Sequence, residues 1–313
     1  MSDYTIDKAK SQYGQAKRQS VELAKSLRRI GDRRWGYIMG CSEAIGIRYC
    51  PTCGKVHVDT SWCCRHRLCA ICAGRRARKT GHQAIDAFKY LREKGALPEG
   101  TGLYLVTLTQ RNVSRTALRD EVQKLQDALS AMRQTRDVRT WLDGSARNVE
   151  ITYNASADTL HPHVHMIAIL KAGYPAEMET SAYWRKLWKR LMALSYEPIC
   201  DVRPIEGTEG AICEVSKYAV KPDSIFGQNL PEKTLDMVVD AVNTAIYGKR
   251  LTTYTGIWRQ ARAALKQKEP DEDLEHDTDA DICGCGAALM TAIMRWSGME
   301  YVPDRSPNAQ THL

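Results

Sequence analysis

The stretch "HPHVHMIAIL" (residues 161–170), which runs from three histidines into an unbroken apolar segment, decides the architecture that we expect. Its apolar half predicts a buried strand, and alternate side chains of a strand point to the same face. His163 and His165 therefore project from one face, while Val164 and Met166 turn to the other. Two neighbouring imidazoles are hard to satisfy by hydrogen bonds alone, but they readily bind a divalent metal ion. The pattern predicts a metal centre on the face of a sheet.

A carboxylate is expected beside the two histidines, because two neutral imidazoles leave a divalent cation under-coordinated and still positive. The segment "RNVEITYN" (147–154) predicts a strand that a polar loop joins to the histidine strand. A hairpin of these two strands would place Glu150 beside the pair, so Glu150 is the expected third ligand. His161 is a weaker candidate, because Pro162 should break the direction of the strand. The alternative is that the histidines are only structural.

Hydrophobic periodicity predicts a regular alternation of elements beyond residue 100. The expected order is strand, helix, strand, strand, helix, strand, helix: 101–110, 114–134, 147–154, 163–170, 179–195, 200–207 and 209–221. Ser114 is the expected N-cap of the first helix, and residues 231–268 look helical with a turn at "YGKR". The order fits an α+β fold with a central open antiparallel sheet and helices packed on one face.

The cysteines are clustered: seven of eleven lie within residues 41–72. Clustering of this kind in a reducing compartment indicates metal binding rather than disulfides. The pairs Cys50-x2-Cys53 and Cys69-x2-Cys72 stand fifteen residues apart, which is typical of a structural zinc site made of two knuckles. The exact set is open, because four further side chains could substitute for members of it: His57, Cys63, Cys64 and His66.

The net charge of +8 is unevenly distributed, since residues 1–96 hold 20 lysines and arginines against 8 acidic residues. A basic N-terminal third indicates a polyanionic partner, most simply DNA. A basic surface that only keeps the protein in solution is the alternative. The arginines expected to contact phosphates lie in and after the cysteine region: Arg65, Arg67, Arg75, Arg76 and Arg78.

The segment "EVSKYAVKP" places an acid, a phenol and a cation at helical spacing. Glu214 and Tyr218 are four apart and Tyr218 and Lys221 three apart, so on a helix they would share one face. Such a group suits a phenolate that attacks phosphorus, because the unperturbed pKa of tyrosine, about 10, makes the phenol a poor nucleophile without help. An ordinary surface ion pair on a helix is the alternative.

These features divide the chain into four expected parts. They are a basic helical N-terminal segment at 1–35, a cysteine-rich zinc-binding DNA-binding module at 36–98, a catalytic domain at 99–268, and an acidic linker with a C-terminal tail at 269–313. The "CGCG" of the tail has no assigned role. The N-terminus is too polar for a secretory signal and no stretch of eighteen apolar residues occurs, so we expect a cytoplasmic protein without membrane contact.

Three short motifs in this order resemble those of the HUH endonucleases, and more closely the single-tyrosine replication initiators (Rep proteins) of rolling-circle plasmids. They are "YLVTLT" (104–109), "HPHVHMIAIL", and Y-x-x-K with a glutamate four residues before the tyrosine. The resemblance covers roughly residues 35–260, and it implies that the sheet is an HUH/RRM-like nuclease core.

What the resemblance implies is a site-specific DNA endonuclease and strand transferase. Glu150, His163 and His165 would hold Mg²⁺ or Mn²⁺, and Tyr218 would attack a single-stranded or hairpin plasmid origin to give a 5′-phosphotyrosine and a free 3′-OH. The host replication machinery would extend that hydroxyl. Glu214 would activate water at termination, and Lys221 would stabilise the phenolate or the phosphate.

Three other kinds of protein compete with this interpretation. A conjugative relaxase or a transposase shares the metal-plus-tyrosine chemistry, but the single tyrosine, its glutamate partner and the absence of a helicase segment disfavour it. A non-enzymatic zinc-module regulator would bind DNA without cleaving it. A metallo-hydrolase that acts through a metal-bound water is a more distant alternative, because it needs more ligands and no tyrosine.

Overall fold

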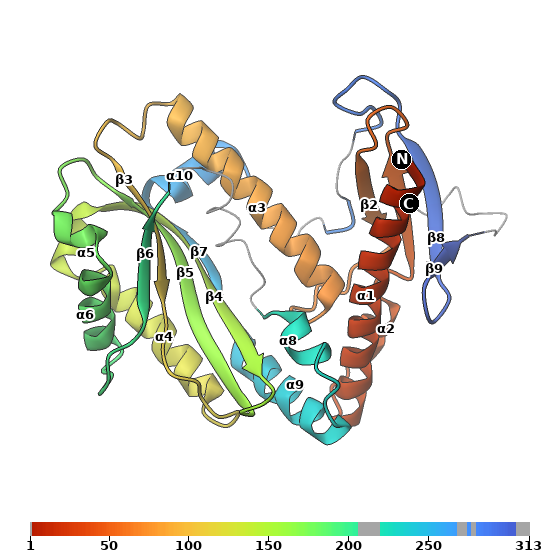
Figure 1. Cartoon of the computed structure of the whole chain (residues 1–313), viewed down its shortest axis with the longest axis horizontal. Coiled ribbons are helices and arrows are strands. Elements are labelled where there is room, and N and C mark those ends of the chain that lie inside the picture. Colours follow the sequence, from red (N-terminus) through yellow and green to blue (C-terminus); the bar gives the residue numbers. More distant parts are fainter. Residues whose placement is uncertain (1, 206–219, 268–273, 277–279, 305–313) are drawn as a thin grey trace. The chain divides into compact units, whose positions relative to one another are not determined.

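The computed structural model divides the chain into two compact units, Met1–Arg76 with Pro270–Leu313, and Ala77–Glu269. The N-terminal segment, the cysteine region and the C-terminal tail therefore share one unit, which differs from the four-part division expected from composition. The structure describes residues 2–205, 220–267, 274–276 and 280–304 (Figure 1).

The larger unit contains a five-stranded antiparallel sheet in the order β6-β3-β5-β4-β7. The strands are β3 (Gly102–Leu108), β4 (Leu142–Asn154), β5 (Thr159–Leu170), β6 (Cys200–Pro204) and β7 (Thr252–Thr255). The expected antiparallel sheet is thus confirmed, but β7 lies in a region that periodicity assigned to helix. A four-residue strand at a sheet edge is too short to show a clear alternation of apolar and polar side chains.

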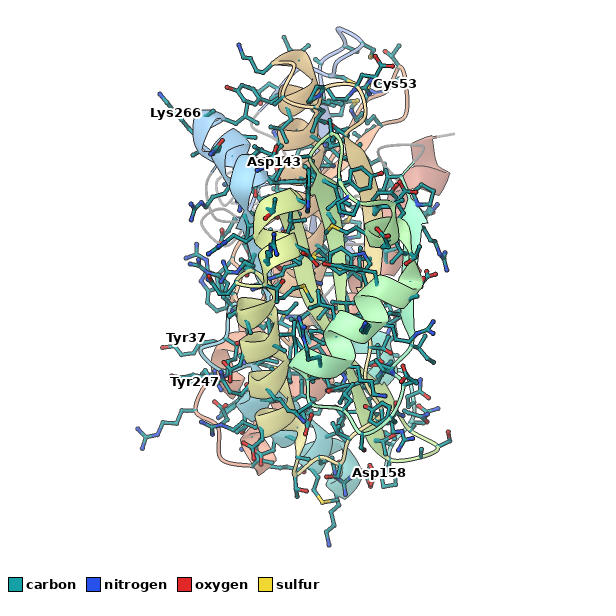
Figure 2. All side chains as sticks on the ribbon, turned by 90° about the vertical axis from the view of Figure 1, so that its left-hand side faces the viewer. Tyr37, Cys53, Asp143, Asp158, Tyr247 and Lys266 are labelled. Carbon is teal, nitrogen blue, oxygen red and sulfur yellow. The ribbon has the colours of Figure 1, made fainter. Side chains whose placement is uncertain are left out.

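The histidine strand is longer than expected, because β5 continues through Pro162. The prediction that this proline breaks the strand was wrong. β3 ends opposite Val164, so at Pro162 the backbone of β5 has a strand partner only on the β4 side. A proline without an N–H is tolerated at such a position. Beyond it, β4 and β5 are joined by a tight turn that contains Asp158 (Figure 2).

Helices cover both faces of this sheet, whereas the sequence predicted helices on one face only. One face packs against α3 (Ala70–Glu93) and α10 (Gly256–Ala264), with Phe88 and Trp258 in a cluster that includes Ile167 and Ile169 of β5. The other face carries α4 (Leu118–Met132) and α6 (Ser181–Leu191), and α9 (Glu232–Ile246) packs on α4 (Figure 1). The prediction missed the second covered face because α3 and α10, which cover it, lie far apart in the sequence.

Shorter helices complete the larger unit: α5 (Arg136–Trp141), the 3-10 helix η1 (Ala176–Glu179) and α8 (Pro222–Phe226). The helix expected from residue 114 begins later, with Ala117 in the N-cap position. The hydroxyl of Ser114 instead accepts a hydrogen bond from the Ala117 amide in the preceding turn, at 3.3 Å.

The smaller unit pairs the two ends of the chain in one antiparallel sheet, in the order β2-β1-β8-β9. It contains α1 (Ser2–Arg29), α2 (Trp35–Gly40), β1 (Ala44–Tyr49), β2 (Val56–Thr60), β8 (Met290–Trp296) and β9 (Tyr301–Pro303). α1 forms where a basic helix was expected. The C-terminal strands β8 and β9 are a correction, because this segment was expected to be only a tail.

Among the helices that the structure describes, none has both the length and the apolar character that a bilayer crossing requires.

Candidate metal centre and cysteine clusters

The register of the β4–β5 hairpin places a carboxylate directly opposite an imidazole. Glu150 pairs with His163, and Asn148 pairs with His165 on the same face. Oε2 of Glu150 lies 3.5 Å from Nε2 of His163 and 3.4 Å from Nε2 of His165. The structure therefore brings together the three side chains that the sequence selected as metal ligands.

The spacing of these three atoms suits a cation better than direct hydrogen bonds. Hydrogen bonds between nitrogen and oxygen are mostly 2.7–3.2 Å long, and both contacts exceed that range. Ligand atoms about 2.1 Å from one ion lie about 3.0–3.4 Å apart, depending on the coordination geometry. The donor set of two imidazoles and one carboxylate also leaves positions open on a divalent ion for further ligands.

The far side of each ring is held by a backbone or side-chain oxygen. Nδ1 of His163 lies 3.1 Å from the carbonyl oxygen of His161, and Nδ1 of His165 lies 3.2 Å from Oγ1 of Thr107. Hydrogen bonds at Nδ1 leave the Nε2 lone pairs for a metal and fix the orientation of both rings. Thr107 lies within the motif "YLVTLT" but was not among the predicted site residues; its alternation in β3 is the signal that could have identified it.

Glu150 is ionised in this environment. Burial raises its pKa, but the contacts with His163 and His165 outweigh burial and hold the pKa at about 2. The carboxylate therefore supplies a fixed negative charge between the two rings at neutral pH.

The centre lies where the apolar cover of the sheet ends. On this face of β5, Ile167 and Ile169 pack beneath α3 and α10, and the next two positions toward the hairpin are His165 and His163. The side chains of the two histidines are 13% and 12% exposed, and that of Glu150 is 9% exposed. Such burial weakens competition from water while leaving an approach for a ligand from solvent.

His161 lies beside the centre without joining it. Its ring stacks on that of His163 with centroids 5.0 Å apart and an interplanar angle of 27°. It does not belong to the three-residue ligand group found among the described residues. Burial lowers the pKa of His161, so this ring is neutral at pH 7.

Tyr218 and Glu214 lie outside the described residues, and only the end of their segment can be located. Val220 forms an isolated parallel bridge with Ile151, the residue after Glu150 in β4. Lys221 is exposed and has an extended backbone, with ψ of 107°. The expected helix therefore does not include Val220 and Lys221, and the placement of Tyr218 relative to Lys221 stays a prediction. The reason is Pro222, which disfavours the helical conformation of the residue before it.

The cysteines form two groups of four rather than the single expected set. Cys69 and Cys72 gather with Cys41 and Cys64, whereas Cys50 and Cys53 belong to a separate group. This corrects the expected site of Cys50, Cys53, Cys69 and Cys72. The physical reason is that the fold, and not the spacing along the chain, decides which cysteine pairs lie close enough to share an ion.

The group of Cys41, Cys64, Cys69 and Cys72 has the dimensions of a tetrahedral thiolate site. Sγ of Cys72 lies 3.5 Å from that of Cys41 and 3.6 Å from that of Cys64, and Cys69 lies 3.7 Å from Cys41. Four sulfurs bound to zinc at 2.3 Å lie about 3.8 Å apart, while a disulfide needs about 2.05 Å. Of the substitutes considered, Cys64 is a member. Cys63 lies 3.3 Å from Oγ1 of Thr60 instead, and His57 and His66 belong to neither group.

The five arginines expected to bind DNA have different environments. Arg75 is buried and donates from its guanidinium to the carbonyl oxygens of Leu274 and Val58 and to the hydroxyl of Tyr13. The expectation that Arg75 faces DNA was therefore wrong, because its donors are used inside the smaller unit. The four others reach solvent wholly or in part, and Arg65 is the most clearly placed of them, with a side chain 52% exposed and an ion pair to Glu275 at 3.6 Å. The remaining members of this group are Arg67, Arg76 and Arg78.

Arg75→Ala should lower the free energy of unfolding of the protein by about 3 kcal/mol, because it leaves buried carbonyl oxygens without a donor. Arg78→Ala, at an exposed position, should change it by no more than about 0.5 kcal/mol. Chemical denaturation followed by circular dichroism measures both. Equal stability of the two variants would contradict the structural role of Arg75.

The larger unit thus combines an antiparallel sheet with a possible metal-binding group of two histidines and one carboxylate, and the smaller unit holds two groups of four cysteines that could bind metal ions. Comparison with protein families matches residues 55–302 to a family described as "Replication protein". The chain is 29% identical to a "Protein rep" of Bacillus sp over 75% of this chain and 81% of that protein. It is 30% identical to a "Protein rep" of Bacillus amyloliquefaciens over 72% and 71%.

A third relative, a "Protein rep" of Lentilactobacillus hilgardii, is 27% identical over 95% of both chains. The chain therefore belongs to the replication protein family, and it is a replication initiator of rolling-circle plasmids. This confirms the family that the three sequence motifs indicated. No solved structure matches the chain.

Proposed function

We propose that this initiator nicks one strand of its plasmid origin by metal-dependent transesterification, with Tyr218 as the nucleophile. The observation that carries the proposal is the convergence of Glu150, His163 and His165 at 3.4–3.5 Å on one face of the sheet. Membership of the replication protein family supplies the substrate, DNA at a replication origin.

The three side chains would hold Mg²⁺ or Mn²⁺, with the Nε2 atoms and a carboxylate oxygen as donors. The cation, when bound, supplies electrostatic stabilisation for the negative charge that develops on the attacked phosphate. Thr107 and the carbonyl oxygen of His161 would fix the orientation of the two imidazole rings. The ionised Glu150 would offset part of the positive charge of the cation.

What supports Tyr218 as the nucleophile is its nearness along the chain to Val220. Val220 pairs with the residue next to Glu150, and two residues of chain span at most about 7 Å. The phenolic oxygen would attack the phosphorus, the bond to the 3′-oxygen would break, and that oxygen would leave as a 3′-OH after taking up a proton. The product is a 5′-phosphotyrosine, a phosphodiester whose retained bond energy allows the strand to be rejoined later.

A mixture of supercoiled origin plasmid, Mn²⁺ and the purified protein tests the proposal. Nicked circles that carry covalently bound protein are expected. A mobility shift of intact circles without nicking would instead favour a DNA-binding regulator. Transfer to a foreign DNA end in preference to origin nicking would favour a relaxase or a transposase.

Glu214→Ala should leave the first nicking step largely intact and slow the release of the protein from DNA, on the order of 10²-fold. The reason is that a general base for water at termination contributes roughly 10²–10⁴-fold to that step only. A single-turnover assay that follows the covalent complex over time measures it, with Glu232→Ala in α9 as the control. Release at the unaltered rate would remove Glu214 from the mechanism.

The smaller unit is proposed to bind the origin duplex or hairpin through its basic surface, with Zn²⁺ as the structural ion of the cysteine group that contains Cys69 and Cys72. The exposed Arg65 follows Cys64 of that group directly, so the zinc site would fix the backbone that carries it. Binding through phosphate contacts should weaken steeply as the salt concentration rises.

A further inference from the structure

We infer that the chain carries a second structural zinc site, made by Cys50 and Cys53 near one end of the chain and by Cys283 and Cys285 near the other. The site goes beyond the proposed nicking function and gives the "CGCG" segment of the tail its purpose. Sγ of Cys50 lies 3.5 Å from that of Cys285, and Sγ of Cys53 lies 3.4 Å from that of Cys283. All four sulfurs lie within 4.8 Å of one another.

These distances identify the chemistry of the group. A disulfide requires about 2.05 Å between the sulfurs, and all four cysteines are free. A zinc ion bonded to four sulfurs at 2.3 Å holds them about 3.8 Å apart. Thiolate ligands without oxygen or nitrogen donors favour zinc over the hard cations that the carboxylate centre would take.

The two halves of the site are loops with corresponding backbone hydrogen bonds, and the second loop is one residue shorter than the first. In the first, the Cys50 amide donates to the carbonyl oxygen of Lys55 at 2.9 Å and the Gly54 amide to that of Cys50 at 3.0 Å. In the second, the Cys283 amide donates to Ala287 and the Gly286 amide to Cys283, both at 2.8 Å. Each loop therefore starts at a buried cysteine and closes at a glycine.

Both closing glycines have a left-handed backbone, with φ of 74° for Gly54 and 89° for Gly286. Glycine adopts this conformation without the cost that a side chain imposes, so each loop can turn tightly around an ion. The Cys53 amide also donates to Sγ of Cys50 at 3.4 Å, a hydrogen bond that stabilises a thiolate. Two facing loops that each carry a pair of closely spaced cysteines are typical of a zinc ribbon.

The sheet of the smaller unit presents the two loops side by side. β1 pairs with β8, with Tyr49 opposite Met290. Tyr49 is the last residue before the first loop, and Met290 begins the strand soon after the second. The pairing thus brings the loops to the same end of the sheet, and the exposed Cys53 (Figure 2) leaves this end open for loading of the ion.

The consequence is a cross-link between segments more than 200 residues apart in the sequence. Zinc there would fix the C-terminal strands to the N-terminal hairpin and so complete the unit proposed to bind DNA. The other cysteine group lies within residues 41–72 and makes no such connection. The tail is thereby a part of the DNA-binding unit and not an appendage.

The test measures zinc in the full-length protein, in a His163→Ala/His165→Ala background so that the carboxylate centre adds no ion. About two zinc ions per chain are expected in this background. Cys283→Ser/Cys285→Ser and Cys41→Ser/Cys64→Ser should each reduce the content to about one. Cys200→Ser, a buried cysteine of β6 outside both groups, should leave two. Retention of two ions by Cys283→Ser/Cys285→Ser would overturn the inference.

Cysteine alkylation of the His163→Ala/His165→Ala protein gives a second measurement. This protein keeps all its cysteines, so the result does not depend on the folding of a cysteine variant. Cys53 and Cys285 are solvent-exposed, so they should react quickly unless an ion holds them. The inference predicts that peptides with Cys283 and Cys285 remain unmodified until a zinc chelator is added. Rapid modification of these peptides before chelation would overturn the inference. It would also be overturned if the cysteines were protected by a disulfide, which the mass of the intact chain would show as the loss of two hydrogens.

Discussion

Tyr218→Phe is expected to abolish nicking of a single-stranded origin oligonucleotide, while the affinity for the same DNA stays within about twofold. Removal of the nucleophile from an enzyme that works by covalent catalysis costs on the order of 10⁶-fold in rate. The lost hydroxyl carries no charge at neutral pH, so phosphate contacts made by arginines and lysines remain. Denaturing gels that separate free DNA from protein-linked DNA measure cleavage, and fluorescence anisotropy measures binding.

Tyr247→Phe is the matched control for this change. Tyr247 follows α9, is 74% exposed and points away from the surrounding elements (Figure 2), and its variant should nick at the rate of the unmodified protein. A covalent adduct formed by the Tyr218→Phe protein at an undiminished rate would reject Tyr218 as the nucleophile.

The second large effect is expected from the double change His163→Ala/His165→Ala. It removes two of the three donors and leaves Glu150 alone, so metal-dependent cleavage should fall on the order of 10³-fold or more, as expected when electrostatic stabilisation of a developing charge is lost. Addition of a chelator to the unmodified protein should produce a loss of similar size. The initial rate of oligonucleotide cleavage over a series of Mn²⁺ concentrations measures both.

His161→Ala is the control here, because this ring lies 5.0 Å from that of His163 on the same face but outside the ligand group. Its rate should fall far less, and the dependence on Mn²⁺ should be preserved. If the double variant and the His161→Ala variant showed equal rates and the same Mn²⁺ dependence, the assignment of His163 and His165 as ligands would fail.

The clustering of the three candidate metal ligands could be predicted from the sequence because it depends on local rules of strand geometry. Alternation in β5 puts His163 and His165 on one face, and a hairpin of adjacent strands needs only a short loop to bring Glu150 opposite. Because Glu150, His163 and His165 lie close together along the chain, their clustering can be predicted without knowledge of the rest of the fold. Thr107 was less visible, since its contact with His165 depends on the pairing of β3 with β5 across 58 residues.

The cysteine groups were not accessible in the same way. Spacing shows that Cys50 and Cys53 form one knuckle, but the partner of that knuckle depends on β8 adding to the sheet beside β1. The role of Arg75 likewise depends on Leu274, about 200 residues later in the chain. The positive charge of an arginine predicts a negatively charged partner. The sequence alone does not show whether backbone oxygens inside the protein already accept the hydrogen bonds of its guanidinium group.

The helix expected to carry both Tyr218 and Lys221 shows that a following proline can outweigh a prediction from helical spacing. Helical spacing favoured one face for both side chains, but Pro222 was also visible in the sequence and restricts Lys221 to an extended backbone. Pro222 therefore limits the predicted helix to residues before Lys221. The role of Lys221 at the phosphate is therefore a proposal without the support of shared helical geometry.

Peptide mapping by mass spectrometry, after reaction of the protein with a labelled origin oligonucleotide and Mn²⁺, tests whether Tyr218 is the nucleophile at a metal centre of His163 and His165. We expect one DNA-bearing peptide, with the nucleotide on Tyr218 through a 5′-phosphate, and no adduct in the His163→Ala/His165→Ala protein. Cleaved DNA with the adduct on another residue, or with no adduct at all, would contradict it.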